Sequence, residues 1–273
     1  MKGLFSITLV LGVSTMVECL SKSDMEKIKA TLKEDHLVGP TNVGAPAVRL
    51  GFHDCVGGCD GCLNLNNKDN AGLANLTQEL EEVYADPDLG YNKLLSRADF
   101  WALAATYSVE LAIEHNNKMC KLSPKKFGLT SYESCKIDIP TWTFKTGRKD
   151  CATSPKTTKD VHLPGATLDY TSMIDFFKTE FGFSPREMTA LMGAHALGSA
   201  FPENSGFKGT WTVVDENALN NQYYRFLIKE KLGSSKMYLL LLQQRDTGNG
   251  ITSDVVLYKA LKVDSSGHTT CLS

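Results

Sequence analysis

The sequence predicts a mostly α-helical protein with a minor contribution from short β-strands, folded as one large domain. Apolar residues recur three, four and seven positions apart over most of the chain, which is the spacing of one helix face. Residues typical of helix ends flank these stripes, such as Ser184-Pro-Arg-Glu187 before one stripe and Gly182 after another. No Gly/Ser-rich or charged run marks a domain boundary in the 273 residues.

The expected helices can be placed from these stripes. They cover Ser21–Leu32, the segment around Arg49 and His53, Leu73–Val83, Ser96–Ile113, Met173–Phe181, Ser184–Gly198 and Tyr223–Leu232. The fourth is strongly apolar, so we expect it to be the central buried helix. Residues 116–168 lack periodicity and predict an irregular crossover held by one disulfide. Residues 237–243 and 252–257 predict a hairpin or short strands.

The N-terminal residues 1–19 have the features of a secretory signal peptide. Lys2 precedes the apolar run Leu4–Val17, which is too short for a comfortable membrane span, and Val17-Glu-Cys19 resembles a cleavage signal. A buried first helix is the alternative. The predicted domain then covers residues 20–273, with a short atypical tail from about residue 260. We expect a secreted protein, in which Asn75-Leu-Thr77 is an N-glycosylation acceptor.

The charge pattern limits the classes of partner. The formal net charge is −2, with acidic and basic residues intermixed. This pattern argues against nucleic acid or an anionic membrane surface as a partner. We expect a soluble monomer that acts on small molecules.

The cysteine content favours an oxidising compartment. The chain has eight cysteines, and a secreted chain with so many is expected to carry disulfides. Removal of Cys19 with the leader leaves an odd number, so one thiol is expected to be free or paired between chains. Cys55 has two local candidates for a disulfide partner, Cys59 and Cys62, and the sequence does not choose between them.

Arg49 and His53 are the first candidate catalytic pair. They lie four residues apart in Ala47-Val-Arg-Leu-Gly-Phe-His-Asp-Cys55, so a helix places both on one face. Arginine is a fixed cation with several donors, and histidine exchanges a proton near neutral pH. Together they can deprotonate a small acid such as hydrogen peroxide and stabilise the anion that leaves. An amphipathic helix with a solvated Arg and a structural His is the alternative for the isolated pair.

His195 is the second candidate. It lies in Met192-Gly-Ala-His-Ala-Leu-Gly198, where small residues leave room for a flat ligand close to the backbone. The alternatives are a structural core histidine or an axial ligand of haem iron. An iron-bound histidine needs an acceptor for its other ring N–H, and Asp254 in Thr252-Ser-Asp-Val-Val-Leu257 is a candidate.

These motifs, in this order, resemble the plant/fungal/bacterial haem peroxidase superfamily. The resemblance also includes Asn70-Ala-Gly-Leu73, Ser96-Arg-Ala-Asp-Phe-Trp-Ala-Leu-Ala104 and Thr146-Gly-Arg-Lys-Asp150, and it extends from about Leu32 to Leu257. The motifs around His195 and Trp211 are most similar to cytochrome c peroxidase, whereas Phe52-His-Asp-Cys55 is nearer the secreted branches. The resemblance implies distal and proximal helical lobes that enclose haem b.

The resemblance also implies roles for individual residues. On the distal side His53 would transfer the peroxide proton, Arg49 would stabilise developing charge, Asn70 would fix the tautomer of His53, and Phe52 would pack on the ring. On the proximal side His195 would be the axial iron ligand and Asp254 would accept its N–H. Trp211 and Pro164 complete the expected cofactor-binding set, with Trp211 either a radical carrier or a core residue.

Other positions mark a metal site and departures from the family. Asp54 and Asp60 match acidic residues that hold a calcium ion on the distal side of the secreted branches, although Cys62 replaces a usual Ser. Ala196 stands where a Thr accompanies a proximal cation, so we expect no proximal cation. Phe201 replaces a His near a haem propionate, and Asn204 replaces an Arg that binds ascorbate. His36, His115, His162 and His268 show no partner pattern and are expected at the surface.

The resulting functional prediction is a secreted haem peroxidase. It would reduce hydrogen peroxide and oxidise an extracellular donor by one-electron steps, with haem b and one calcium ion as candidate cofactors. The alternative is a peroxidase-fold matrix or scaffold protein with weak or no activity, which the short C-terminus and the odd cysteine favour.

Overall fold

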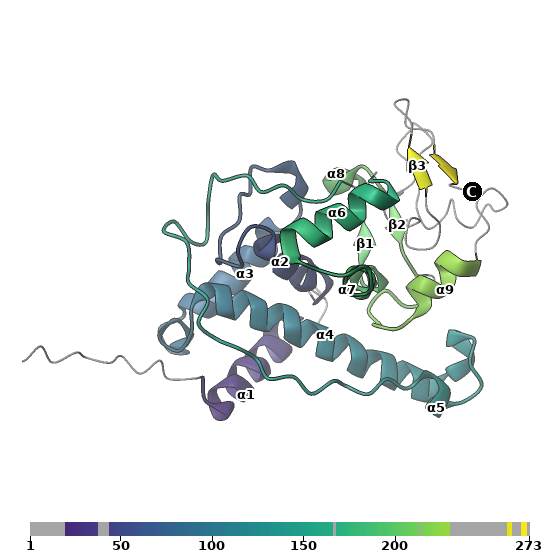
Figure 1. The fold of residues 1–273 in the computed structure, drawn as a ribbon. Coiled ribbons are helices and arrows are strands. Elements are labelled where there is room, and N and C mark those ends of the chain that lie inside the picture. Colours follow the sequence, from purple (N-terminus) through teal and green to yellow (C-terminus); the bar gives the residue numbers. More distant parts are fainter. Residues whose placement is uncertain are drawn as a thin grey trace, which may run out of the picture.

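A computed structural model describes residues 20–37, 44–165, 168–212 and 214–229, together with strands at 261–263 and 269–271. Within these residues helices predominate and the β-structure is limited to short pairs, so the predicted mostly α class is confirmed. The longer helices are α1 (Lys22–Thr31), α2 (Gly44–Cys55), α3 (Ala74–Ala85), α4 (Arg97–Leu122), α6 (Tyr170–Phe181), α7 (Pro185–Met192) and α9 (Gln222–Lys229) (Figure 1). Shorter helical turns are η1 (Leu32–Leu37), η2 (Lys68–Asn70), η3 (Tyr91–Lys93), η4 (Pro124–Phe127), α5 (Tyr132–Cys135), η5 (Gly193–Ala196) and α8 (Pro202–Ser205).

Helix α4 is the buried centre of the fold, as its apolar sequence predicts. It begins after Ser96, whose hydroxyl accepts the backbone N–H of Asp99, and it continues past the predicted end at Ile113 to Leu122. Phe100, Trp101 and Leu103 are fully or almost fully buried in a cluster with apolar side chains of α1, α2 and α3. In Figure 1, α2 and α3 lie on one side of α4 and α1 lies on the other.

The predicted crossover is a long extended segment that returns along α4 in the opposite direction (Figure 1). Hydrogen bonds attach it at intervals: the Asn117 amide donates to the Ile137 carbonyl at 2.7 Å, and the Trp142 indole N–H donates to Glu110 at 2.8 Å. Near the start of α4, the Gly147 N–H donates to Asp99 at 2.7 Å. These bonds explain how a segment without helical periodicity keeps a fixed position.

Three disulfides are present in the described part of the chain. Cys55 pairs with Cys59, which resolves the choice left open by the sequence, and Cys62 pairs with Cys151. Cys120 pairs with Cys135. The crossover therefore carries two disulfides, where one was predicted. The second forms because Cys62, in the loop after α2, lies next to Cys151 of the crossover. Cys19 and the side chain of Cys271 lie outside the described residues, so the free thiol stays a prediction.

Helices α6 and α7 are bounded as their end signals predict, with one exception. Gly182 ends α6 with φ +69°, and Ser184 and Glu187 form a reciprocal capping box before α7. The predicted helix through Gly198 is wrong at its C-terminal end, because α7 ends at Met192 and is followed by the 3₁₀ turn η5. The chain then becomes extended at Leu197, and Gly198 has φ +79°, which ends helical geometry.

The described β-structure consists of two antiparallel pairs. Strand β1 (Ser199–Ala200) pairs with β2 (Gly209–Thr210). In the tail, β3 (Leu261–Val263) pairs with β4 (Thr269–Cys271). The strands predicted at 237–243 and 252–257 lie outside the described residues.

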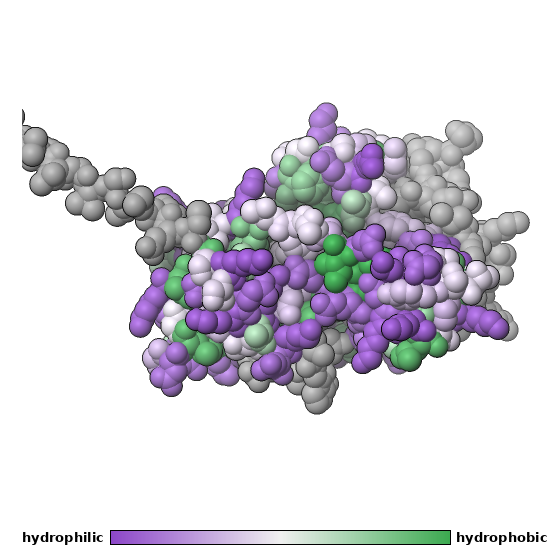
Figure 2. Space-filling view, turned by 90° about the horizontal axis from the view of Figure 1, so that it is seen from below, coloured by the Kyte–Doolittle hydropathy of each residue, from purple (hydrophilic) through white to green (hydrophobic). Residues whose placement is uncertain are grey.

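None of the described helices is both long and apolar enough to cross a membrane. On the face drawn in Figure 2 hydrophilic side chains predominate, and the hydrophobic areas between them are small and separate.

Candidate functional site

Helix α2 holds Arg49 and His53 on the side away from its buried face. Ala47, Leu50 and Asp54 are buried, whereas Arg49, Phe52 and His53 are half-buried. The close approach of α2 to α4 depends on Gly51, since a Cβ there would lie 2.5 Å from the Ala105 Cβ.

His53 has a fixed orientation and a defined tautomer. Its Nδ1 lies 2.7 Å from the Asn70 side-chain oxygen, and the Asn70 amide donates to the Asn64 carbonyl at 2.9 Å. Asn70 is buried, and its amide group uses the nitrogen on Asn64, so its oxygen faces the ring and Nδ1 must donate. The Nε2 atom is then the free base. Burial, and next the nearby Arg49 charge, lower the pKa of His53 to about 4, although the Asn70 bond acts in the opposite direction.

Arg49 is attached to the same loop that orients His53. Its guanidinium donates to the Ala71 carbonyl at 2.8 Å and to the Asp69 carbonyl at 2.6 Å. Burial lowers the pKa of Arg49 and the neighbouring Asp69 carboxylate raises it. Because η2 and the residue after it supply partners to both side chains, the Arg–His pair and Asn70 form one connected unit.

Phe52 extends the distal side toward α6. Its ring centroid lies 6.3 Å from that of Phe177 and 6.0 Å from that of Phe181. The apolar cluster around Met173 and Phe177 contains many half-buried side chains, including Leu191 and Met192 of α7. Apolar side chains of α2, α6 and α7 therefore form a surface beside His53 that the chain covers only in part.

His195 lies in η5 and makes aromatic contacts. Its ring stacks on Trp211, with centroids 4.7 Å apart and planes 13° apart. Tyr223 of α9 meets it edge-on at 5.9 Å. Trp211 was among the expected cofactor-binding residues, whereas Tyr223 was predicted only as a helix residue. The adjacent Tyr223-Tyr224 pair was the available signal, and it is weak because aromatic residues are common in helix cores.

The small residues around His195 lie close to neighbouring segments of the chain. A Cβ at Gly193 would lie 2.9 Å from the Tyr224 hydroxyl, and a Cβ at Gly198 would lie 3.0 Å from the Ala45 Cβ. Ala196 is buried in the cluster with Tyr223. These three positions therefore lie against other parts of the chain, and room for a flat ligand beside His195 stays a prediction.

A planar, largely apolar cofactor fits the residues that are present. Phe52, Leu191, Met192 and Trp211 are half-buried aromatic or apolar side chains, and such surface is stabilised when a ligand covers it. An imidazole at His195 is a suitable iron ligand. Pro164 is half-buried in the segment before α6, and Asp254 lies outside the described residues.

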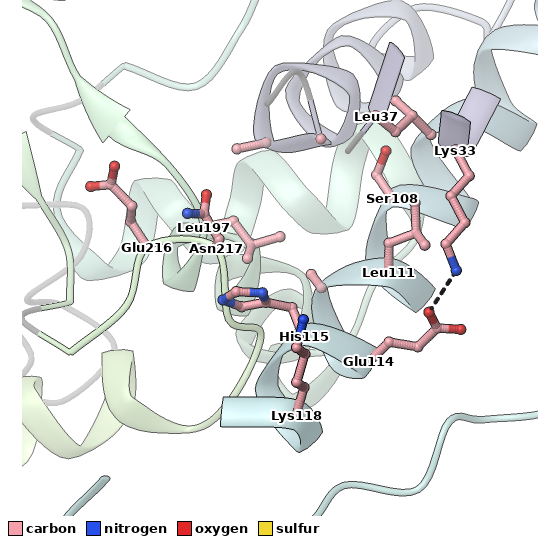
Figure 3. A pocket seen from close by; sticks show the side chains of 13 residues that line it. Lys33, Leu37, Ser108, Leu111, Glu114, His115, Lys118, Leu197, Glu216 and Asn217 are labelled. Carbon is pink, nitrogen blue, oxygen red and sulfur yellow. Dashed lines mark hydrogen bonds and ion pairs between the residues drawn. The ribbon is translucent and has the colours of Figure 1, made fainter. Parts of the chain in front are cut away.

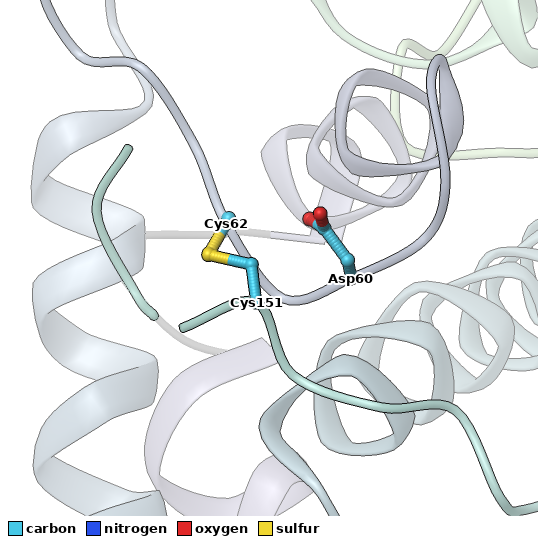
Figure 4. Close-up of side chains that lie close together, drawn as sticks. All are labelled: Asp60, Cys62 and Cys151. Atoms are coloured by element: carbon cyan, nitrogen blue, oxygen red, sulfur yellow. A yellow bond between two sulfur atoms is a disulfide. The ribbon is translucent and has the colours of Figure 1, made fainter. Parts of the chain in front are cut away.

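Asp54 and Asp60 do not face open solvent as a ready-made pair of calcium ligands. Asp54 is buried and accepts the Cys62 N–H at 3.2 Å. Burial raises the pKa of Asp54 to about 7, with a smaller contribution from the Asp60 charge and opposing backbone hydrogen bonds from the residues that follow. Figure 4 shows Asp60 beside Cys62 and Cys151, whose ligand atoms lie within 4.8 Å of one another. Both sulfurs are in a disulfide, so they are not thiolate ligands.

His115, one of the histidines expected at the surface, has a hydrogen-bond partner. His115 is partly exposed, and its Nε2 lies 3.0 Å from the Asp215 carboxylate. Asp215 is a hundred positions further along the chain, and no local pattern could indicate it. His162 is exposed, as predicted, and the side chains of His36 and His268 lie outside the described residues.

Comparison with known sequences defines the class to which this fold and site belong. A family model described as peroxidase matches residues 25–265. The chain therefore belongs to the peroxidase family, within the haem peroxidase superfamily.

Individual relatives come from several branches. Peroxidase 30 of Arabidopsis thaliana is 26% identical over 246 residues, covering 86% of this chain and 67% of the relative. A mitochondrial cytochrome c peroxidase of Emericella nidulans is 29% identical over 240 residues, covering 81% of this chain and 57% of the relative. A relative from Pyricularia oryzae, named as a heme-binding peroxidase, is 40% identical over 161 residues, covering 59% and 43%. The chain thus spans about half the length of the two fungal relatives.

Proposed function

We propose that this chain is a secreted haem peroxidase that reduces hydrogen peroxide and oxidises an extracellular donor by one-electron steps. The observation that carries the proposal is the connected unit of His53, Asn70 and Arg49. A histidine kept neutral, with Nε2 free and a cation beside it, has the properties that peroxide cleavage requires.

Each of the three residues His53, Asn70 and Arg49 has its own role in the transfer of one proton. His53 Nε2 accepts a proton from one oxygen of hydrogen peroxide and returns it to the other oxygen, which leaves as water. Asn70 keeps Nδ1 protonated, so that Nε2 remains the base. Arg49 donates to the oxygen on which negative charge develops. Its hydrogen bonds to the Asp69 and Ala71 carbonyls fix the guanidinium beside His53.

His195 is the residue that would hold the iron of haem b, with Asp254 as the acceptor for its other N–H. Phe52, Trp211 and Pro164 would contact the ring. When bound, haem supplies a metal that holds peroxide and accepts its two oxidising equivalents. The half-buried apolar side chains on both sides support this assignment, as does the family. Trp211, stacked on His195, is the candidate residue for storing one equivalent.

Secretion is supported by three disulfides and by similarity to the plant peroxidases, although other relatives are named as mitochondrial or cytosolic. Disulfides persist mainly in oxidising compartments. Residues 1–19, the proposed leader, lie outside the described part of the chain. Expression in a secretory cell, followed by N-terminal sequencing of the medium, tests the leader, and an N-terminus at Met1 would contradict it.

A calcium ion at Asp54 and Asp60 is the finer part of the proposal. A bound cation would favour the ionised form of Asp54, which burial disfavours. We therefore expect calcium to raise the unfolding temperature near pH 7 in the wild-type protein. Asp54→Asn should abolish this increase, and an equal increase in both proteins would contradict the site.

The direct test is spectroscopic. The haem-reconstituted chain is mixed with hydrogen peroxide in a stopped-flow instrument, and the Soret band is followed. Rapid conversion, lost in His53→Leu, supports the proposed enzyme. A Soret band that only bleaches slowly would support the alternative of a peroxidase-fold scaffold. His195→Ala distinguishes the proposed iron ligand from the proposed base, since loss of His195 should weaken haem binding itself.

A further inference from the structure

A second cavity lies away from the proposed peroxide site. It has a volume of about 510 Å³ and lies between α4, the end of η1, the start of α2 and the segments around Leu197 and Glu216 (Figure 3). Neither Arg49, His53 nor His195 lines it. The volume is in the range of sites that hold small organic molecules.

The interior of this cavity is apolar. Leu37, Leu111, Ala112 and Leu197 line it, and each is at least nine-tenths buried. The Ser108 hydroxyl, also in the lining, already donates to the Ala104 carbonyl at 2.8 Å. A ligand that enters must therefore have an apolar body, because the interior provides few unused polar groups.

The charged groups at the mouth differ in whether they already have a partner. Glu114 pairs with Lys33 at 3.2 Å, and Glu216 accepts the Ser199 hydroxyl at 2.7 Å. His115 is bonded to Asp215. Lys118 forms no hydrogen bond or ion pair with the residues the structure describes, and Figure 3 shows its side chain extending beside His115. The charge available for a ligand is therefore positive.

We propose that this cavity binds a small aromatic carboxylate. The ring would pack on Leu111, Ala112 and Leu197, and the carboxylate would pair with Lys118. A cationic ligand fits less well, because both carboxylates at the mouth already accept hydrogen bonds. A neutral aromatic ligand would gain the apolar contacts without the ion pair. The proposal depends on neither haem nor peroxide chemistry.

The experiment compares three probes with the same aromatic body and different charge. Naphthoate, naphthylmethanol and naphthylmethylamine are titrated into the full chain, with and without haem, and binding is followed by probe fluorescence. Naphthoate should bind more tightly than the other two, by about fivefold, which is the effect of one exposed ion pair of about 1 kcal/mol. Equal or tighter binding of the amine would overturn the proposal.

Variants test the location of the ligand. Lys118→Gln should remove the preference for naphthoate, whereas Lys121→Gln on the same helix, outside the lining, should leave it unchanged. Ala112→Leu fills the interior and should weaken binding of naphthoate and naphthylmethanol alike by tenfold or more. Since that variant could fail to fold, Ala45→Met, at a half-buried lining position, provides a second filling variant. Unchanged binding in folded filling variants would contradict the site, whatever the peroxide reactivity.

Discussion

The distal and proximal sides of the proposed haem site are held by different means. His53 lies on a twelve-residue helix packed closely on α4, and its tautomer is fixed by Asn70, which is itself bonded to Asn64. The Cys55–Cys59 disulfide joins the end of this helix to the following loop. His195 lies in a short 3₁₀ turn and is contacted by aromatic rings from later segments.

This difference follows from what each side must do. In the proposed mechanism, proton transfer by His53 would depend on which ring nitrogen carries the proton and on the direction in which the ring points, and the hydrogen-bond network with Asn70 fixes both. A metal ligand at His195 needs correct placement, and the metal bond itself would then fix the ring. The comparison therefore indicates that distal changes alter reaction rates, whereas proximal changes alter cofactor binding.

The largest effect is expected for His53→Leu. Loss of the base should slow reaction with peroxide by about a hundredfold to ten-thousandfold, while haem affinity remains near wild type. Stopped-flow absorption measures the rate, and haem titration measures the affinity. His162→Leu, at an exposed histidine, is the matched control. A near-normal peroxide rate in His53→Leu would remove His53 from the mechanism.

Asn70→Ala should have the next largest effect. Without the acceptor at Nδ1, both tautomers of His53 become populated and the ring loses its fixed direction, so we expect a rate decrease of about tenfold to a hundredfold. Asn70→Asp keeps an acceptor at Nδ1 and should retain more of the rate than Ala does. If both variants react as fast as the wild type, the connected distal unit has no catalytic importance.

A pair of glycine substitutions compares the packing of the two sides. Gly51→Ala places a Cβ 2.5 Å from the Ala105 Cβ, between two helix backbones, and should lower the free energy of unfolding by about 1–3 kcal/mol. Gly193→Ala meets the hydroxyl end of the Tyr224 side chain, which can shift at the expense of its hydrogen bond to the Thr189 carbonyl, so we expect about 1 kcal/mol. Gly165→Ala is the control, since the nearest described side chain to its added Cβ is that of Leu168 at 4.0 Å. Urea unfolding measures all three, and a larger loss at Gly193 would reverse the comparison.

The smallest effect within the physiological range is that of pH. Since the pKa of His53 is lowered to about 4, the neutral base predominates above pH 5 and is lost as the pH falls through 4. The peroxide rate constant should therefore be nearly flat from pH 7 to 5 and decrease about tenfold per unit well below pH 4. A midpoint near pH 6.5 in stopped-flow measurements would show that the site leaves His53 unperturbed.

Local signals in the sequence were sufficient to predict the position of most helices. The apolar stripe of α4, the capping box of Ser184 and Glu187, and the stop at Gly182 were all read correctly, because each depends on neighbours within a few residues. The end of α7 was not predicted, since the chain changes at Met192 to the 3₁₀ turn η5, which lies against Tyr223 and Tyr224 of α9. A contact between segments this far apart in the chain does not change the hydrophobic periodicity of either segment, so the sequence does not indicate it.

The sequence by itself determined the mostly α class, the spacing of Arg49 and His53 on one helix face, and the presence of Trp211 and Asn70 among the candidate site residues. The first two follow from helix periodicity, and the last follows from the resemblance of the motifs to the haem peroxidase superfamily. Only the tertiary structure decided that Gly193 lies against Tyr224, that Gly198 lies against Ala45, and that Cys62 pairs with Cys151. Such pairings join residues far apart in the chain, and they form because burial of the apolar core around α4 brings those segments together.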